Sequence, residues 1–363
     1  MTKPPMISSS LGIARAATRS SALRVSASKL RLLSTLDESH RIHEDFLRDV
    51  AKVDPPKRLR SVLKLSSMVG EELCSPRARA GLNPFLIPIS KNKEDNSMTC
   101  FIRWPTQKKD MDLQIVKTTE SGVRLYSLSA DHYCHRIAVE LDFLGSEQAT
   151  KAIDLLNSDG ELYTAGSYLS LLQSGKFSIG TDSELRLVLD RYLLTKVGAF
   201  PDCYERLATN FANNGDATSA LITCERSTSV FYSWGHAIHS QTKMMRSLGR
   251  HLESKESARA SMAAPKWTLG GSKEDLEDAV RCAGFTQTKL LGDMHAFRAT
   301  DPRETEVSEG GLNPMQVPLD QAAHLMDAVA LGNGSWDEAR PELSRRYREV
   351  GYPDIADFID TVE

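Results

Sequence analysis

The spacing of apolar residues changes near residue 130, from short runs to helical intervals. Between residues 82 and 128, apolar and β-branched runs of strand length alternate with polar turns. These runs are residues 84–90, 98–105, 113–118 and 123–129. We expect them to form a small antiparallel sheet of about four strands. Pro84, Pro88 and Pro105 should lie near strand ends or on an edge, because proline cannot donate to the hydrogen-bond ladder.

Helical patterns lie on both sides of this predicted sheet. Residues 40–53 and 54–73 each place apolar side chains at helical spacing, which predicts two N-terminal helices. From residue 131 onwards, helical segments are separated by brief polar turns, so consecutive helices should be antiparallel neighbours. Asp131, Ser146, Thr181, Ser272 and Ser335 stand where helix N-caps are expected. The fold class predicted is therefore α+β, predominantly α-helical.

The changes of pattern divide the chain into six predicted segments. They are residues 1–36 (a disordered transit peptide), 37–80 (N-terminal helices), 81–129 (the sheet), 130–299 (a helical-hairpin domain), 300–318 (a flexible linker) and 319–363 (a C-terminal helical hairpin). The linker is predicted from its polar, glycine and proline content, which disfavours packing.

The N-terminal segment differs from the rest in charge. Its 36 residues include six basic residues and eight serines but no acid, which is the composition of an organelle transit peptide. No apolar stretch typical of a secretory signal follows the first charges. Residues 31–35 resemble a mitochondrial processing site, and residues 25–28 resemble a plastid one. We favour the mitochondrion, with the plastid as the alternative; a basic tail on a cytosolic protein is a third interpretation.

The composition of the remaining chain excludes some classes of protein. Residues 37–363 contain 39 of the 45 basic residues and all 48 acidic residues. This excess of acidic residues argues against general nucleic-acid binding. No run approaches the roughly 18 apolar residues of a membrane-spanning helix. The six cysteines are irregularly spaced and contain no C-x-x-C, so we expect free, mostly buried thiols.

One helical pair has a more specific spacing than the others. Large, small, aromatic and turn-glycine positions follow one another as in a tetratricopeptide repeat, and the same spacing recurs four repeat lengths later. The positions are Leu207, Ala208, Phe211, Gly215 and Ala220, and then Leu343, Ser344, Tyr347, Gly351 and Ala356. The chain thus resembles degenerate tetratricopeptide-like helical hairpins, which implies a protein-binding surface. Any tight helical hairpin needs similar residues, and that alternative stays open.

A second resemblance covers most of the chain after the transit segment. Residues 101–117, 204–226 and 264–271 resemble an organelle-targeted family of plants and algae whose activity is uncharacterised. This resemblance implies no catalytic residue and no cofactor.

Histidines raise the question of a metal site. His132, Cys134 and His135 are close in sequence, but on a helix Cys134 falls on the apolar face, opposite the two histidines. His236 and His239 form another pair three residues apart, and two such pairs on facing helices would make a four-histidine site. The alternative is that His132 and His135 are surface or inter-domain groups that hydrogen-bond near a helix start, and that His236 and His239 cap or pack a second helix. We predict no metal and no cofactor, and these four histidines are the only candidate ligands.

Other chemistry leaves no recognisable pattern. The chain has no phosphate-binding loop, and residues 268–275 provide only a Gly-Gly turn before a helix. No nucleophile motif surrounds a serine or a cysteine. We therefore favour a non-enzymatic organellar scaffold or assembly factor that binds a protein partner through a helical-hairpin surface. The alternative is an organellar enzyme whose active site is assembled from distant segments.

Overall fold

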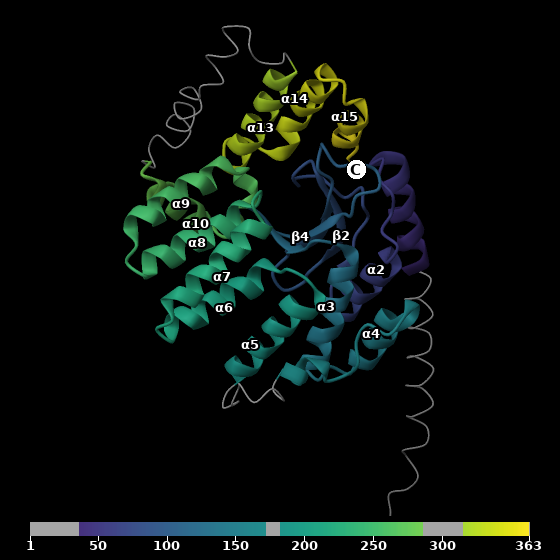
Figure 1. Ribbon diagram of the computed structural model, residues 1–363. Helices are drawn as coiled ribbons and strands as arrows, with labels where there is room; N and C mark the ends of the chain where they lie inside the picture. Colours follow the sequence, from purple (N-terminus) through teal and green to yellow (C-terminus); the bar gives the residue numbers. More distant parts are fainter. Residues whose placement is uncertain (1–35, 172–181, 286–314, 363) are drawn as a thin grey trace, which may run out of the picture.

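A five-stranded antiparallel sheet lies at the centre of the computed structural model, with helices around it (Figure 1). The structure describes residues 36–171, 182–285 and 315–362, so the predicted transit peptide up to residue 35 and residues 300–314 of the predicted linker lie outside it. The strand order is β1-β2-β3-β4-β5. Their bounds are β1 (Glu72–Leu73), β2 (Leu86–Lys91), β3 (Met98–Ile102), β4 (Gln114–Thr119) and β5 (Gly122–Ser127).

The four predicted strands are confirmed as β2 to β5. The two-residue edge strand β1 corrects the prediction of one helix over residues 54–73, because α2 ends at Met68. Thr119 pairs with Gly122, so β4 and β5 are joined by the tight hairpin that the sequence indicates. The order of the strands follows the chain because every connection is a hairpin or a short loop. The α+β, mainly helical fold class is therefore confirmed.

Pro88 lies inside β2 and not at its end, but within the described residues no strand pairs with the other side of β2 at this residue, which agrees with the predicted edge position. The register with β3 shifts between Pro88 and Ser90, which marks a β-bulge. The carbonyl of Pro88 accepts a hydrogen bond from Nε2 of His43 at 3.0 Å, so the edge of β2 that points away from β3 contacts a side chain here and not another strand. β1 pairs with β2 only beyond this point, from Ser90 onwards. The missing N–H of Pro88 therefore interrupts no ladder.

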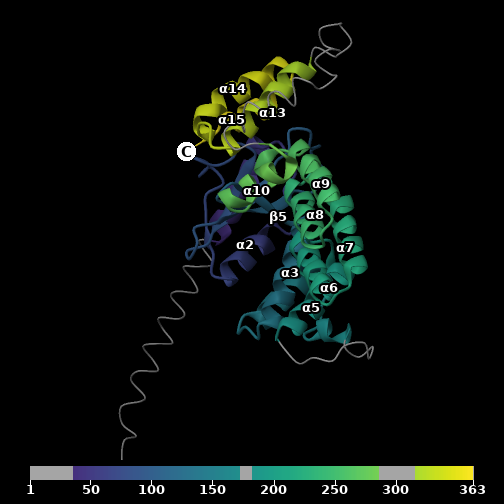
Figure 2. The same ribbon diagram turned by 90° about the vertical axis from the view of Figure 1, so that its left-hand side faces the viewer.

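Helices lie around the sheet, with the following bounds in chain order. Residues 36–45 are helical and continue into η1 (Phe46–Val50). The remaining helices and short turns are α2 (Leu59–Met68), α3 (Ala130–Phe143), α4 (Ala149–Leu156), η2 (Asn157–Asp159), η3 (Ser167–Leu171), α5 (Asp182–Tyr192), η4 (Leu193–Val197), α6 (Pro201–Asn213), α7 (Ala217–Val230), α8 (Gly235–Ser247), α9 (His251–Ala263), η5 (Lys266–Thr268), α10 (Lys273–Ala283), α13 (Gln316–Ala330), α14 (Trp336–Glu349) and α15 (Pro353–Asp360). Figures 1 and 2 show α6 to α9 side by side, with α13 to α15 at one end of the molecule and α4 and α5 at the other.

Three local predictions about helix starts need correction. α3 begins at Ala130, and its N-cap is Ser129, whose hydroxyl accepts a hydrogen bond from the backbone N–H of His132 at 3.2 Å. The predicted cap, Asp131, lies in the first turn, where its negative charge interacts favourably with the positive end of the helix dipole. Residues 316–318, predicted as the end of the linker, belong to α13; its first turn tolerates a proline. The predicted caps Ser272 and Ser335 are confirmed, each in a capping box. The predicted cap Ser146 is wrong, because the N-cap position of α4 is Gln148, and Thr181 lies outside the described residues.

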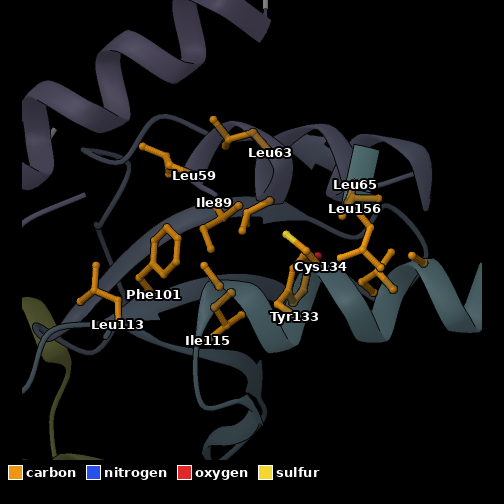
Figure 3. Packing of buried hydrophobic residues seen from close by; sticks show 14 of the residues in the cluster. Leu59, Leu63, Leu65, Ile89, Phe101, Leu113, Ile115, Tyr133, Cys134 and Leu156 are labelled. Atoms are coloured by element: carbon orange, nitrogen blue, oxygen red, sulfur yellow. The ribbon is translucent and has the colours of Figure 1, made fainter. Parts of the chain in front are cut away.

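Strand alternation sends apolar side chains to both faces of the sheet, and each face has its own core. One face carries Ile89, Phe101 and Ile115, which pack against α2 and α3 (Figure 3). The opposite core joins strand residues to α8, η5 and α13 to α15. Its members include Leu86, Ile102, Val116, Val123, Leu125, Trp234, Trp267, Met326, Leu343 and Ile359.

The last helix closes the core beside the first. The ring of Phe358 on α15 packs edge-on against Phe46, with the ring centroids 6.3 Å apart. The fully buried guanidinium of Arg79 stacks 3.9 Å from the ring centroid of Phe358 and donates a hydrogen bond to the carbonyl of Thr361 at 2.7 Å. The N-terminal helices are therefore part of the central core rather than a separate layer ahead of it.

Candidate functional site

Helix α3 places the first group of candidate ligands. Cys134 is fully buried in the core (Figure 3), on the apolar face that its spacing predicts. His132 and His135 are half-buried, with their rings against Phe200 and Tyr163 at centroid distances of 6.4 and 6.0 Å. Nδ1 of His132 and Nε2 of His135 are buried without a hydrogen-bond partner. The two rings therefore pack between helices and do not share a ligand with Cys134.

Helix α8 places the second pair, and both of its histidines are buried. Nε2 of His236 lies 3.3 Å from a carboxylate oxygen of Glu205 on α6. His239 is 3% exposed, and neither of its ring nitrogens has a hydrogen-bond partner. Burial lowers the pKa of His239 to about 4. This side chain is therefore neutral at physiological pH.

The two histidine pairs do not form one site. In the part of the chain that the structure describes, no group of three or more His, Cys, Asp or Glu side chains is arranged to hold a metal ion. His132 and His135 contact aromatic rings, whereas His236 contacts a carboxylate. The hypothesis of a four-histidine site therefore has no geometric support within the described residues.

An ion-pair network behind α3 was missed by the sequence analysis. A helical wheel places Arg136 on the solvent side of α3, yet its side chain is only 3% exposed. Its guanidinium donates to both carboxylate oxygens of Asp202 at 2.9 and 2.6 Å. Asp202 also pairs with Arg206, which binds the fully buried carboxylate of Asp190 through two hydrogen bonds of 2.7 Å. The network joins α3 to α5 and α6, and these two helices cover the polar side of α3.

The pKa of Asp202 reflects this network. Burial on its own would raise the pKa of the Asp202 carboxyl, but Arg136 and Arg206 lower it well below its usual range. Each charge of the network has a hydrogen-bonded partner, so the network fixes how the helical layer joins the sheet region. Charged pairs four residues apart, Arg136 with Glu140 and Asp202 with Arg206, were the available signal in the sequence.

Both segments with tetratricopeptide-like spacing form helical hairpins. In the α6–α7 pair, Ala208 and Ala220 are buried where the helices cross, and Gly215 turns the chain with φ +78°. In the α14–α15 pair, Ala356 is buried and Gly351 has φ +79°. The predicted hairpins are present; the assignment to tetratricopeptide repeats stays a prediction, because any tight hairpin has these features.

Large apolar side chains are exposed on the helical layer. Ile222 on α7 is 60% exposed, Tyr232 after α7 is 78% exposed and Leu252 on α9 is 83% exposed. We call these three residues the hairpin surface. Single exposed apolar side chains are common on proteins, and Leu144 at the end of α3 is 70% exposed, so the three residues mark only the positions at which a partner surface is proposed. None of the described helices combines the length and apolar character needed to span a membrane.

Comparisons with known proteins cover nearly the whole chain. Family models described as PAB N-terminal, PAB middle domain and PAB C-terminal domain match residues 41–178, 201–286 and 294–362. The chain is similar to Protein IN CHLOROPLAST ATPASE BIOGENESIS, chloroplastic, of Arabidopsis thaliana, with 34% identity over 319 residues that cover 87% of this chain and 90% of the relative. No solved structure matches. This agrees with the resemblance to an organelle-targeted plant family, and the chain belongs to the PAB family.

Proposed function

We propose that this protein is a plastid assembly factor that acts in the biogenesis of the ATPase by binding a protein partner, without catalysis. One observation carries the proposal: the similarity to the Arabidopsis relative extends over 87% of this chain and 90% of that protein. Such coverage includes the sheet, the helical layer and the C-terminal helices together. A shared function therefore explains the similarity more simply than the presence of one common domain in two otherwise different proteins.

The helical layer supplies the proposed binding surface. Ile222, Tyr232 and Leu252 keep large apolar areas in water, which costs free energy that a partner would recover on binding. Aromatic and aliphatic side chains of this kind are frequent anchors of protein interfaces. The hairpin surface is thus the part of the molecule where we expect a subunit of the ATPase to bind.

We place the protein in the plastid, although its processing pattern favours the mitochondrion. The Arabidopsis relative is named as chloroplastic, which supports the plastid alternative. Leu36 is buried in the core, so we expect the transit peptide to be removed before this residue, which makes it at least one residue shorter than the predicted segment 1–36. Import of the labelled precursor into isolated plastids and mitochondria, followed by sequencing of the mature N-terminus, tests both points. Import into mitochondria alone, or a mature chain that starts after Leu36, would contradict them.

The decisive experiment is isolation of the full-length tagged protein from plastids, together with measurement of assembled ATPase in plants that lack it. The expected results are stoichiometric recovery of an ATPase subunit and a reduced amount of assembled ATPase. Recovery of no ATPase subunit, with a normal amount of assembled enzyme, would refute the proposal.

A further inference from the structure

Two asparagines of the chain are each followed by glycine, and both pairs lie at the end of a helix. They are Asn214–Gly215 after α6 and Asn333–Gly334 after α13. Both helices end in a Schellman motif, in which the first two N–H groups beyond the C-cap donate back to carbonyls of the last turn. The two pairs occupy different positions of this motif, so their N–H groups have different surroundings.

In the α6 motif, the glycine of the pair supplies one of the capping N–H groups. Asn214 is the C-cap, and the N–H of Gly215 donates to the carbonyl of Ala212 at 3.0 Å. The side-chain Nδ2 of Asn214 also donates, to Oδ1 of Asn210 at 3.3 Å. Hydrogen bonds therefore hold both groups that a reaction between Asn214 and Gly215 would use.

In the α13 motif, the asparagine–glycine pair lies two positions further along. The motif is completed by the N–H groups of Gly332 and Asn333, which donate at 2.9 Å to carbonyls of the last helical turn. Gly334 follows and lies outside the motif. Within the described residues, the N–H of Gly334 and the side-chain amide of Asn333 have no hydrogen-bond partner, and both residues are exposed. The groups that are held at the end of α6 are thus free at the end of α13.

We propose that Asn333, and not Asn214, is a site of spontaneous deamidation, and that the fold makes this selection. The backbone nitrogen of Gly334 attacks the side-chain carbon Cγ of Asn333, and the side-chain nitrogen leaves as ammonia with the proton of the attacking nitrogen. Water then opens the cyclic imide at either of its two carbonyl carbons, which gives aspartate or isoaspartate. Glycine permits the attack because it has no Cβ beside the nitrogen, and the φ of Gly334, +88°, favours glycine here.

Isoaspartate at this position changes the turn between α13 and α14. Its backbone runs through the former side chain and is longer by one CH2 group, directly beside the N–H that completes the α13 motif. Ser335, the N-cap of α14, follows Gly334 and forms a capping box with Glu338. The modification therefore lies where two helix ends meet, and the isoaspartate form cannot keep the present geometry of both.

The test compares the two asparagines within one molecule. The purified full chain is kept at mildly alkaline pH, and the tryptic peptides that contain Asn214 and Asn333 are followed by mass spectrometry. We expect Asn333 to react at least about fivefold faster, because the N–H of Gly215 first has to release a hydrogen bond of ordinary strength. In urea-unfolded protein the two rates should become equal. Labelling of the folded protein by an isoaspartate-specific methyltransferase should be lost in N333Q, because glutamine forms the larger cyclic imide far more slowly, and retained in the matched control N214Q.

Three results would overturn the inference. The first is equal rates at Asn214 and Asn333 in the folded protein, or no reaction at Asn333 over a period in which the unfolded protein reacts. The second is a difference in rate that persists in urea, because the selection would then come from the neighbouring sequence and not from the fold. The third is methyltransferase labelling of N333Q equal to that of the wild type, which would place the isoaspartate elsewhere in the chain.

Discussion

Replacement of His239 by leucine should remove part of the acid sensitivity of this fold. The ring of His239 is buried with no hydrogen-bond partner, and desolvation is the largest cause that lowers its pKa from 6.5 to about 4. Below pH 6.5 the unfolded chain binds a proton at this residue that the folded chain does not, so stability is lost as the pH falls from about 6.5 to 4. At pH 5 this single group should destabilise the fold by about 2 kcal/mol, and below pH 4 by about 3 kcal/mol.

The assay is denaturant unfolding at pH 8 and pH 5 for the wild type, His239→Leu and His251→Leu. His251 is exposed at the start of α9 and serves as the control. At pH 8 the His239 variant should be close to the wild type, because no hydrogen bond is removed. Between pH 8 and pH 5 it should lose about 2 kcal/mol less than the wild type, whereas the His251 variant should lose the same amount as the wild type. Equal losses in all three proteins would refute the reasoning.

Three further substitutions test the partner surface, the buried network and a close backbone contact. Ile222→Asp should weaken capture of ATPase subunits at least about tenfold, whereas Met111→Asp, on an exposed loop, should leave it unchanged; equal effects would argue against the hairpin surface. Asp190→Asn should lower the free energy of unfolding by about 2 kcal/mol, because it replaces a fully buried carboxylate that accepts two hydrogen bonds from the partly exposed Arg206, and Asp357→Asn, in an exposed pair, by less than about 1 kcal/mol. Gly122→Ala should cost more than about 2 kcal/mol in urea unfolding, since its Cβ would lie 2.2 Å from a backbone oxygen; an unchanged midpoint would show that the turn can move.

Features that depend on neighbouring residues were predictable. Alternation located β2 to β5, and the capping boxes at Ser272 and Ser335 follow from hydrogen bonds that reach only three residues. The cap of α3 was placed two residues too late, because both Ser129 and Asp131 are good caps and only the backbone conformation selects one. Local chemistry thus sets the type of an element more firmly than its first residue.

The candidate site was less accessible to such reasoning. Periodicity placed Cys134 in the core correctly, but it placed Arg136 in solvent, because a helical wheel contains no information about a second layer of helices. The full burial of Asp190 also depends on the neighbouring helix, from which Arg206 donates two hydrogen bonds to its carboxylate. Neither residue lies in a motif, so only the folded arrangement singles them out.

The amino-acid sequence by itself determined the strand-rich and helical regions, the hairpin turns and the composition of the N-terminal segment, because these arise from spacing and local chemistry. Only the tertiary structure decided that Phe358 packs beside Phe46, that the histidine pairs stay apart, and that Arg136 and Asp190 are buried in one ion-pair network. Each of these depends on which distant segment covers a given face, and the pattern of a single segment is the same whether that face meets water or another helix.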